Sequence, residues 1–162
     1  MKSKKVAIYG LLVALAFILS YIESLFPLAV AIPGIKLGLA NLVVITALYK
    51  MGVKEAFVLS IIRIILVGFT FGNASTMMFS LVGGLLSWLL MVIFHKLKIF
   101  SMIGVSIIGG IAHNIGQIVV AMFVVHSIDM IYYLPFLLLF GVIMGALIGI
   151  LGTIIIKSLK TT

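Results

Sequence analysis

Residues 132–156 read YYLPFLLLFGVIMGALIGILGTIII, an almost wholly apolar run of 25 residues without a charged side chain. A helix needs about 20 apolar residues to cross the hydrocarbon core of a bilayer, so this run predicts a transmembrane helix. The rest of the chain has the same character: apolar residues make up 65% of its 162 residues and charged residues only 9%. Soluble domains carry roughly 25% charged residues. So few charges cannot cover a water-soluble protein, and lipid is therefore the expected solvent.

Six apolar segments are predicted along the chain, and the short connections between them leave no room for a soluble domain. We therefore expect a single all-α domain over residues 1–162, a polytopic bundle of six transmembrane helices. The second segment is short for a span. The predicted spans cover residues 6–26, 37–51, 54–71, 76–94, 102–125 and 132–156.

The basic residues orient this bundle. With the N-terminus in the cytoplasm, nine lysines fall on the inner side, Lys36 alone falls outside, and Arg63 lies within a span. This bias is the positive-inside pattern. We therefore expect both termini in the cytoplasm and a multi-pass protein of the bacterial cytoplasmic membrane. The inner lysines are Lys2, Lys4, Lys5, Lys50, Lys54, Lys96, Lys98, Lys157 and Lys160.

The first segment has a second interpretation. A basic start, MKSKK, followed by an apolar run is also typical of a secretory signal peptide, with Ala14–Ala16 as its cleavage site. The apolar run continues past that site to Ile22, and cleavage would leave an odd number of spans. We therefore interpret the first segment as a permanent span.

Composition also excludes several classes of function. The chain has no cysteine, and its three acidic residues and three histidines are too few and too scattered for a typical metal cluster. It has no GxxxxGK[ST] phosphate loop. The net charge of +8 comes from lysines at segment ends rather than from a basic patch with exposed aromatics, which argues against nucleic acid. We expect no catalytic residues, no metal, no cofactor and no enzymatic activity.

Polar side chains at membrane depth are costly and are therefore candidates for function. Arg63 lies about 15 Å along its helix from Val53, at 1.5 Å per residue, which is too deep for easy snorkelling. In the fifth segment, Gly110, His113, Asn114 and Gln117 follow the i, i+3, i+4, i+7 spacing of one helix face. Near the outer ends of the first two segments lie Glu23, Lys36 and Asn41.

These polar groups converge on the outer half of the predicted bundle, which indicates a binding pocket open to the outside. The predicted substrate-binding residues are Glu23, Lys36, Asn41, Arg63, His113, Asn114 and Gln117. Structural roles remain as alternatives: Arg63 and Glu23 form a structural ion pair, and His113 is an ordinary hydrogen-bonded interior histidine. Tyr132 and Tyr133 belong either to the pocket mouth or to the interfacial aromatic belt. The apolar connection 27–36 forms either a cap over the outer face or an interfacial loop.

Small residues form two ridges. Gly141, Gly145, Gly149 and Gly152 have the spacing that allows close helix contact, and we expect them to pack inside the bundle. In the first segment, Ala7, Gly10 and Ala14 lie on the side of the helix opposite Glu23. This second ridge is a candidate partner-binding surface.

Four motifs carry a family resemblance: ESLFP at 23–27, PGIKLGLAN at 33–41, SIIRIILVG at 60–68 and GGIAHNIGQ at 109–117. Together they resemble the Gx transporter family, which is also described as heptaprenyl diphosphate synthase component I. That family looks like a relative of the substrate-binding S components of energy-coupling factor (ECF) transporters. The resemblance is collinear over nearly the whole chain.

The resemblance implies a six-helix S-component fold and a partner, a transmembrane coupling protein that carries two cytoplasmic ATPases. In S components, small residues of the first helix contact the coupling protein. Gly10 and Ala14 match that position in a GxxxA pattern, with glycine in place of the first alanine.

Two functions therefore stand side by side. The first is the substrate-binding component of an ECF-type importer, which takes up a small anionic or zwitterionic solute such as a vitamin or precursor. The second is a non-catalytic accessory subunit of prenyl diphosphate or quinone metabolism, or of membrane electron transfer, with a lipid ligand. Prenyl chain elongation needs clustered carboxylates to hold Mg²⁺. The acids of this chain, Glu23, Glu55 and Asp129, lie on different segments, so it cannot catalyse that reaction alone.

Overall fold

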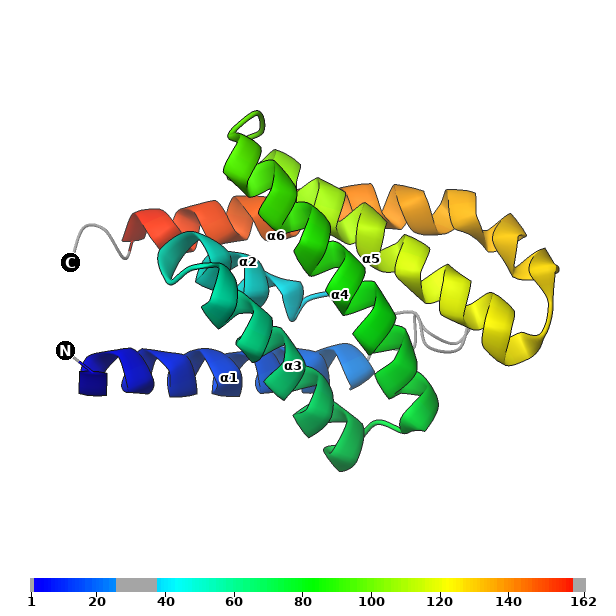
Figure 1. Cartoon of the computed structure of the whole chain (residues 1–162), viewed down its shortest axis with the longest axis horizontal. Helices are drawn as coiled ribbons and strands as arrows, with labels where there is room; N and C mark the ends of the chain where they lie inside the picture. Colours follow the sequence, from blue (N-terminus) through cyan, green and yellow to red (C-terminus); the bar gives the residue numbers. More distant parts are fainter. Residues whose placement is uncertain (1, 26–37, 159–162) are drawn as a thin grey trace.

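The computed structural model describes residues 2–25 and 38–158, and within them it contains helices and no strands. The all-α class is therefore confirmed for this part of the chain (Figure 1). The elements are α1 (Lys2–Leu25), α2 (Asn41–Lys50), α3 (Val53–Thr70), α4 (Ala74–Leu97), α5 (Met102–Val125), the 3₁₀ helix η2 (Ile128–Tyr133) and α6 (Leu134–Ser158).

Helix boundaries follow from local chemistry. Gly52 between α2 and α3 has a φ of 128°, a region that favours glycine. Asn73 accepts a hydrogen bond from the backbone N of Thr76, whose hydroxyl in turn accepts one from the Asn73 backbone, so α4 begins with a capping box. The α5 helix ends at Val125, and the residue that follows, His126, adopts the left-handed conformation.

Four helical segments are long and apolar enough to cross a membrane: Val6–Leu25, Ala74–Leu97, Met102–Val125 and Ile128–Ser158. The two remaining predicted spans differ from these. α3 has 18 residues, but Lys54, Glu55 and Arg63 are charged. α2 has only 10 residues and is about 15 Å long, roughly half the thickness of the hydrocarbon core. The count of six spans stays a prediction.

α2 lies at the centre of the bundle and packs against α1, α3, α4 and α6. Most of its side chains are buried, including Val43, Ile45 and Ala47. Non-helical backbone at membrane depth is tolerated where protein rather than lipid surrounds it. A short helix can therefore begin inside the bundle because its neighbours shield the turn at Gly38–Ala40 that leads into it.

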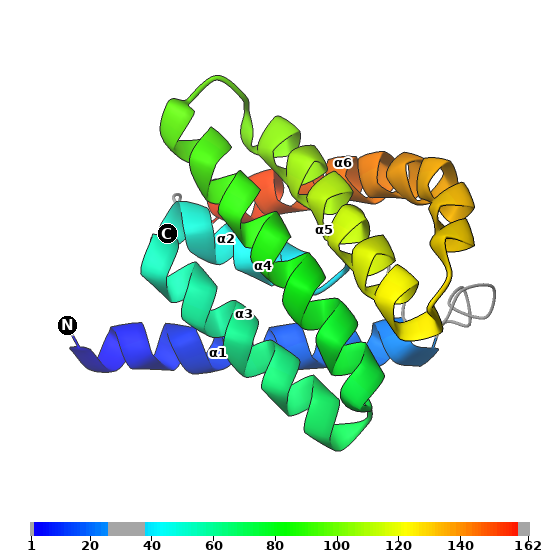
Figure 2. The same cartoon turned by 45° about the vertical axis from the view of Figure 1, so that its right-hand side comes forward.

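α5 lies between α4 and α6 and makes the most extensive contacts among the described helices (Figure 2). A Cβ atom placed on Gly145 would lie 2.6 Å from Cα of Ile107, and one on Gly149 would lie 2.6 Å from Cα of Ile103. The glycine ridge of residues 141–152 therefore packs inside the bundle against α5, as its spacing predicts. On the other side of α5, Gly116 meets the backbone of Gly83 in α4 just as closely.

α1 lies at the edge of the bundle, where it packs against α2 and α3. Of the four candidate membrane spans it is the least covered by the rest of the protein. The beginning of α1 and the end of α6 lie at the same end of the bundle (Figures 1 and 2).

Candidate functional site

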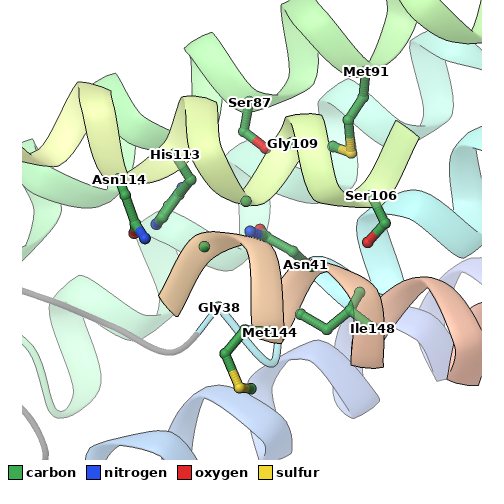
Figure 3. Close-up of a pocket in the computed structure, with 13 residues that line it drawn as sticks. Gly38, Asn41, Ser87, Met91, Ser106, Gly109, His113, Asn114, Met144 and Ile148 are labelled. Carbon is green, nitrogen blue, oxygen red and sulfur yellow. The ribbon is translucent and has the colours of Figure 1, made fainter. Parts of the chain in front are cut away.

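A small cavity lined by both polar and apolar residues lies where α4, α5 and α6 meet the beginning of α2 (Figure 3). The space open to the centre of a water molecule is about 20 Å³, which is room for about one water. In this conformation the cavity is therefore too small for a vitamin-sized solute. Its polar lining consists of Asn41, Ser87, Ser106, His113 and Asn114.

The side chain of Glu23, at the end of α1, contacts the backbone just before α2. Its Oε1 accepts a hydrogen bond from the backbone N of Gly38, and its side chain is 6% exposed. Gly38 has a φ of 80° and precedes α2 by three residues. A carboxylate in this position is favoured by the positive end of the α2 dipole. The contact therefore places a buried negative charge beside the entrance to the central helix.

Arg63 is the buried positive charge of the site. Its side chain is 5% exposed, and its guanidinium interacts electrostatically with Glu23. Neither Nε nor Nη2 of Arg63 has a hydrogen-bond acceptor in the part of the chain that the structure describes. The predicted charge pair is thus present as an electrostatic interaction, but it leaves these two donors unused.

The polar face of α5 meets two helices rather than one. His113 and Gln117 lie against α4, where a Cβ on Gly83 would lie 2.8 Å from the His113 carbonyl oxygen and 3.2 Å from Gln117 Cγ. Asn114 faces α6, and its Nδ2 donates a 2.6 Å hydrogen bond to the carbonyl of Leu137. The face predicted from the spacing therefore lies at the junction of three helices.

The seven predicted binding residues do not all share one cavity. Asn41, His113 and Asn114 line it, whereas Glu23, Arg63 and Gln117 are buried outside its lining. Lys36 and the predicted cap of residues 27–36 lie outside the described residues. Tyr132 and Tyr133 are exposed on η2 and do not line the cavity. We use the name polar layer for the buried set Glu23, Asn41, Arg63, Ser87, Ser106, His113, Asn114 and Gln117.

Sequence reasoning missed Ser87 and Ser106. Ser87 is 1% exposed and its Oγ has no hydrogen-bond partner in the described residues. A signal for both was present: Ser80, Gly83, Gly84 and Ser87 repeat the i, i+3, i+4, i+7 spacing in the fourth segment. Ser106 extends the His113 face by two turns in the fifth.

The small ridge of α1 faces outward. Ala7, Gly10 and Ala14 are exposed, and a Cβ on Gly10 would have no atom within 4 Å. Glu23 is buried on the opposite side of the same helix. The predicted geometry of this ridge is therefore present, while its partner stays a prediction.

The described residues contain no group of three or more His, Asp or Glu side chains that could hold a metal ion. Together, the long apolar helices and the polar layer indicate a helical membrane protein whose mainly apolar interior contains buried polar side chains. Residues 12–155 match the family described as heptaprenyl diphosphate synthase component I, and the chain belongs to that family. Comparison with curated proteins and with solved structures gave no significant match. The predicted family is confirmed, and the relation to ECF S components stays a prediction.

Proposed function

We propose that this protein is a non-catalytic membrane subunit of prenyl diphosphate metabolism, which holds a polar-headed ligand for a partner enzyme. The observation that carries this proposal is a match to heptaprenyl diphosphate synthase component I in a chain whose apolar bundle encloses a polar layer. An apolar bundle suits a prenyl tail, and the polar layer suits its head group.

The arrangement of carboxylates supports a non-catalytic role. Glu23 is engaged with Gly38 at the beginning of α2, Glu55 lies in the first turn of α3, and Asp129 lies in η2. Mg²⁺ on a diphosphate is held by protein carboxylates together with the phosphates and water, and these three acids lie on different elements. Catalysis would therefore come from the partner enzyme, and this chain would bind or deliver the substrate.

The proposal includes the full topology: one domain, six spans and both termini in the cytoplasm. The common position of the beginning of α1 and the end of α6 supports an even number of crossings. α2 and α3 would complete the set, with α2 shielded inside the bundle and α3 carrying Arg63 towards Glu23.

A second function is supported by one specific observation, the outward-facing ridge of Ala7, Gly10 and Ala14. Small residues allow the backbones of two membrane helices to approach closely. In this alternative the chain is the substrate-binding component of an ECF-type importer, and the ridge contacts a coupling protein that carries two ATPases. The ligand would then be a small anionic or zwitterionic solute.

Affinity purification from native membranes separates the two functions. The synthase-subunit proposal expects a prenyl diphosphate synthase to co-purify and expects prenyl-lipid levels to fall when the chain is deleted. The importer expects a coupling protein and ATPases instead, and Gly10→Leu should break that complex. Ile8→Phe changes an exposed residue on another face of α1 and serves as the control. Co-purified ATPases together with unchanged prenyl lipids would reject the first proposal.

A further inference from the structure

The unused donors of Arg63 point to a bound anion. A guanidinium carries five N–H donors in a planar fork, and Nε and Nη2 share the edge that pairs with two oxygens of one oxyanion. In Arg63 that whole edge lacks an acceptor in the described residues, although the side chain is only 5% exposed. Buried donors without a partner are costly, and more so on a charged group.

The charges around Arg63 come from Glu23 and from two helix ends. Glu23 supplies one negative charge, and it already accepts a hydrogen bond from the backbone of Gly38. Opposite it lie the full positive charge of Arg63 and the partial positive charge at the N-terminus of α2, a helix of 10 residues. Glu23 itself lies in the last turn of α1, whose end carries a partial negative charge, so the helix ends offset each other and the unused donors of Arg63 carry the inference.

We propose that the Nε–Nη2 edge of Arg63 binds a phosphate-type oxyanion, the diphosphate head of a prenyl compound or another phosphate with the same chemistry. Arginine suits this task better than lysine because its flat fork matches two phosphate oxygens at once. The choice of phosphate over carboxylate rests on the proposed function. Arg63 is buried, so the anion reaches it only when the helices around α3 part.

A purely structural role for Arg63 and an anion-binding role predict different effects of substitutions at Arg63 and Glu23. If Arg63 only neutralised Glu23, a lysine would keep the charge that this role needs, and removal of the Glu23 charge would leave a buried cation uncompensated. If Arg63 binds an anion, a lysine keeps the charge but cannot make the bidentate hydrogen bonds of a guanidinium. Removal of the Glu23 charge then takes away a competing negative group and strengthens binding. Glu23→Gln keeps an oxygen that can accept the hydrogen bond of Gly38, so it changes charge more than shape.

The test is native mass spectrometry and calorimetry of the detergent-purified full chain with inorganic pyrophosphate and with farnesyl diphosphate. We expect both Arg63→Lys and Arg63→Gln to weaken binding by a factor of about 10 or more, the usual value of a charge-assisted pair. Glu23→Gln should tighten it. Lys54→Gln removes an exposed cation from the same helix and should change affinity by less than about twofold.

The source of the phosphate follows from the same series. Binding of farnesyl diphosphate alone assigns the site to a prenyl head group, and binding of both probes assigns it to free or lipid-borne diphosphate. Competition by anionic phospholipid in nanodiscs, compared with zwitterionic lipid, assigns it to a membrane head group. The proposal fails if neither probe binds the wild-type chain, or if Arg63→Lys and Arg63→Gln bind as the wild type does. If the chain binds the anion but its deletion leaves prenyl-lipid levels unchanged, the proposed function is rejected while the anion site at Arg63 is retained.

Discussion

Gly110 of α5 and Gly141 of α6 bring the backbones of their helices into direct contact: a Cβ atom on Gly110 would lie 2.5 Å from the carbonyl oxygen of Gly141. No real side chain tolerates that separation, so the contact needs glycine at position 110, while a Cβ atom on Gly141 would lie a tight 3.0 Å from the Gly110 carbonyl oxygen. The cavity begins at this point, because both glycines are part of its lining. This close contact between α5 and α6 and the cavity are therefore parts of one arrangement.

Gly110→Ala should lower the free energy of unfolding by about 1–3 kcal/mol, because the added methyl group overpacks a backbone contact. Gly10→Ala is the matched control, since it makes the same change inside a helix where nothing lies within 4 Å. The control should be neutral or slightly stabilising, because alanine is the better helix former. Thermal unfolding in the same detergent measures both. Equal effects at the two positions would contradict the glycine contact.

Asn114→Leu should cost about 0.6–1.7 kcal/mol, the range for a hydrogen bond between membrane helices. The variant removes the donor to the Leu137 carbonyl while it keeps a side chain of similar size. Ile115→Leu, at the next and more exposed position, should leave stability unchanged. Denaturant unfolding of the purified variants gives the comparison, and an Asn114→Leu protein as stable as the wild type would refute the role of this bond.

Ser87→Ala should separate binding from stability. The Ser87 hydroxyl is buried and has no hydrogen-bond partner in the described residues, so its removal should cost less than about 0.5 kcal/mol or should stabilise the fold. If the cavity contributes to ligand binding, the same variant should bind prenyl diphosphate more weakly. Parallel unfolding and binding curves test this. A loss of stability without a loss of binding would place Ser87 among the packing residues only.

The chain lacks native cysteine, so single introduced cysteines report topology without background labelling. With cytoplasmic termini and six spans, Ile99→Cys should react with a membrane-impermeant maleimide only from the cytoplasmic side. Ser75→Cys and Asp129→Cys should react only from outside. Labelling of intact cells and of inverted vesicles makes the measurement. Reaction of Ile99→Cys and Asp129→Cys from the same side would overturn the predicted orientation.

The helical class and most helix boundaries could be predicted because they depend on local hydropathy. α5 covers residues 102–125 as predicted, and α4 differs from its predicted span by two or three residues at each end. α2 could not be predicted as well. Its apolar residues are buried against four helices, so hydropathy could not distinguish a short interior helix from a membrane span.

The sequence predicted many of the residues that form the site, but not which helices each of them contacts. Spacing alone placed His113 and Asn114 on one face, but it could not show that one lies against α4 and the other bonds to α6. Glu23 and Gly38 meet across an intervening segment of chain, which periodicity cannot report. Ser87 was overlooked because a single hydroxyl in an apolar segment is a weak signal without knowledge of its neighbours.

The glycine contacts on both sides of α5 have a mechanical consequence. Contacts made by backbone against backbone lack the interlocking side chains that resist lengthwise sliding of one helix past another. A small shift of α6 along α5 would therefore exchange no side-chain contacts at Gly110, Gly141 and Gly145, although it would strain the hydrogen bond from Asn114 to the Leu137 carbonyl. The same three glycines line the cavity, so such a shift would change the width of the cavity and thereby control access to it.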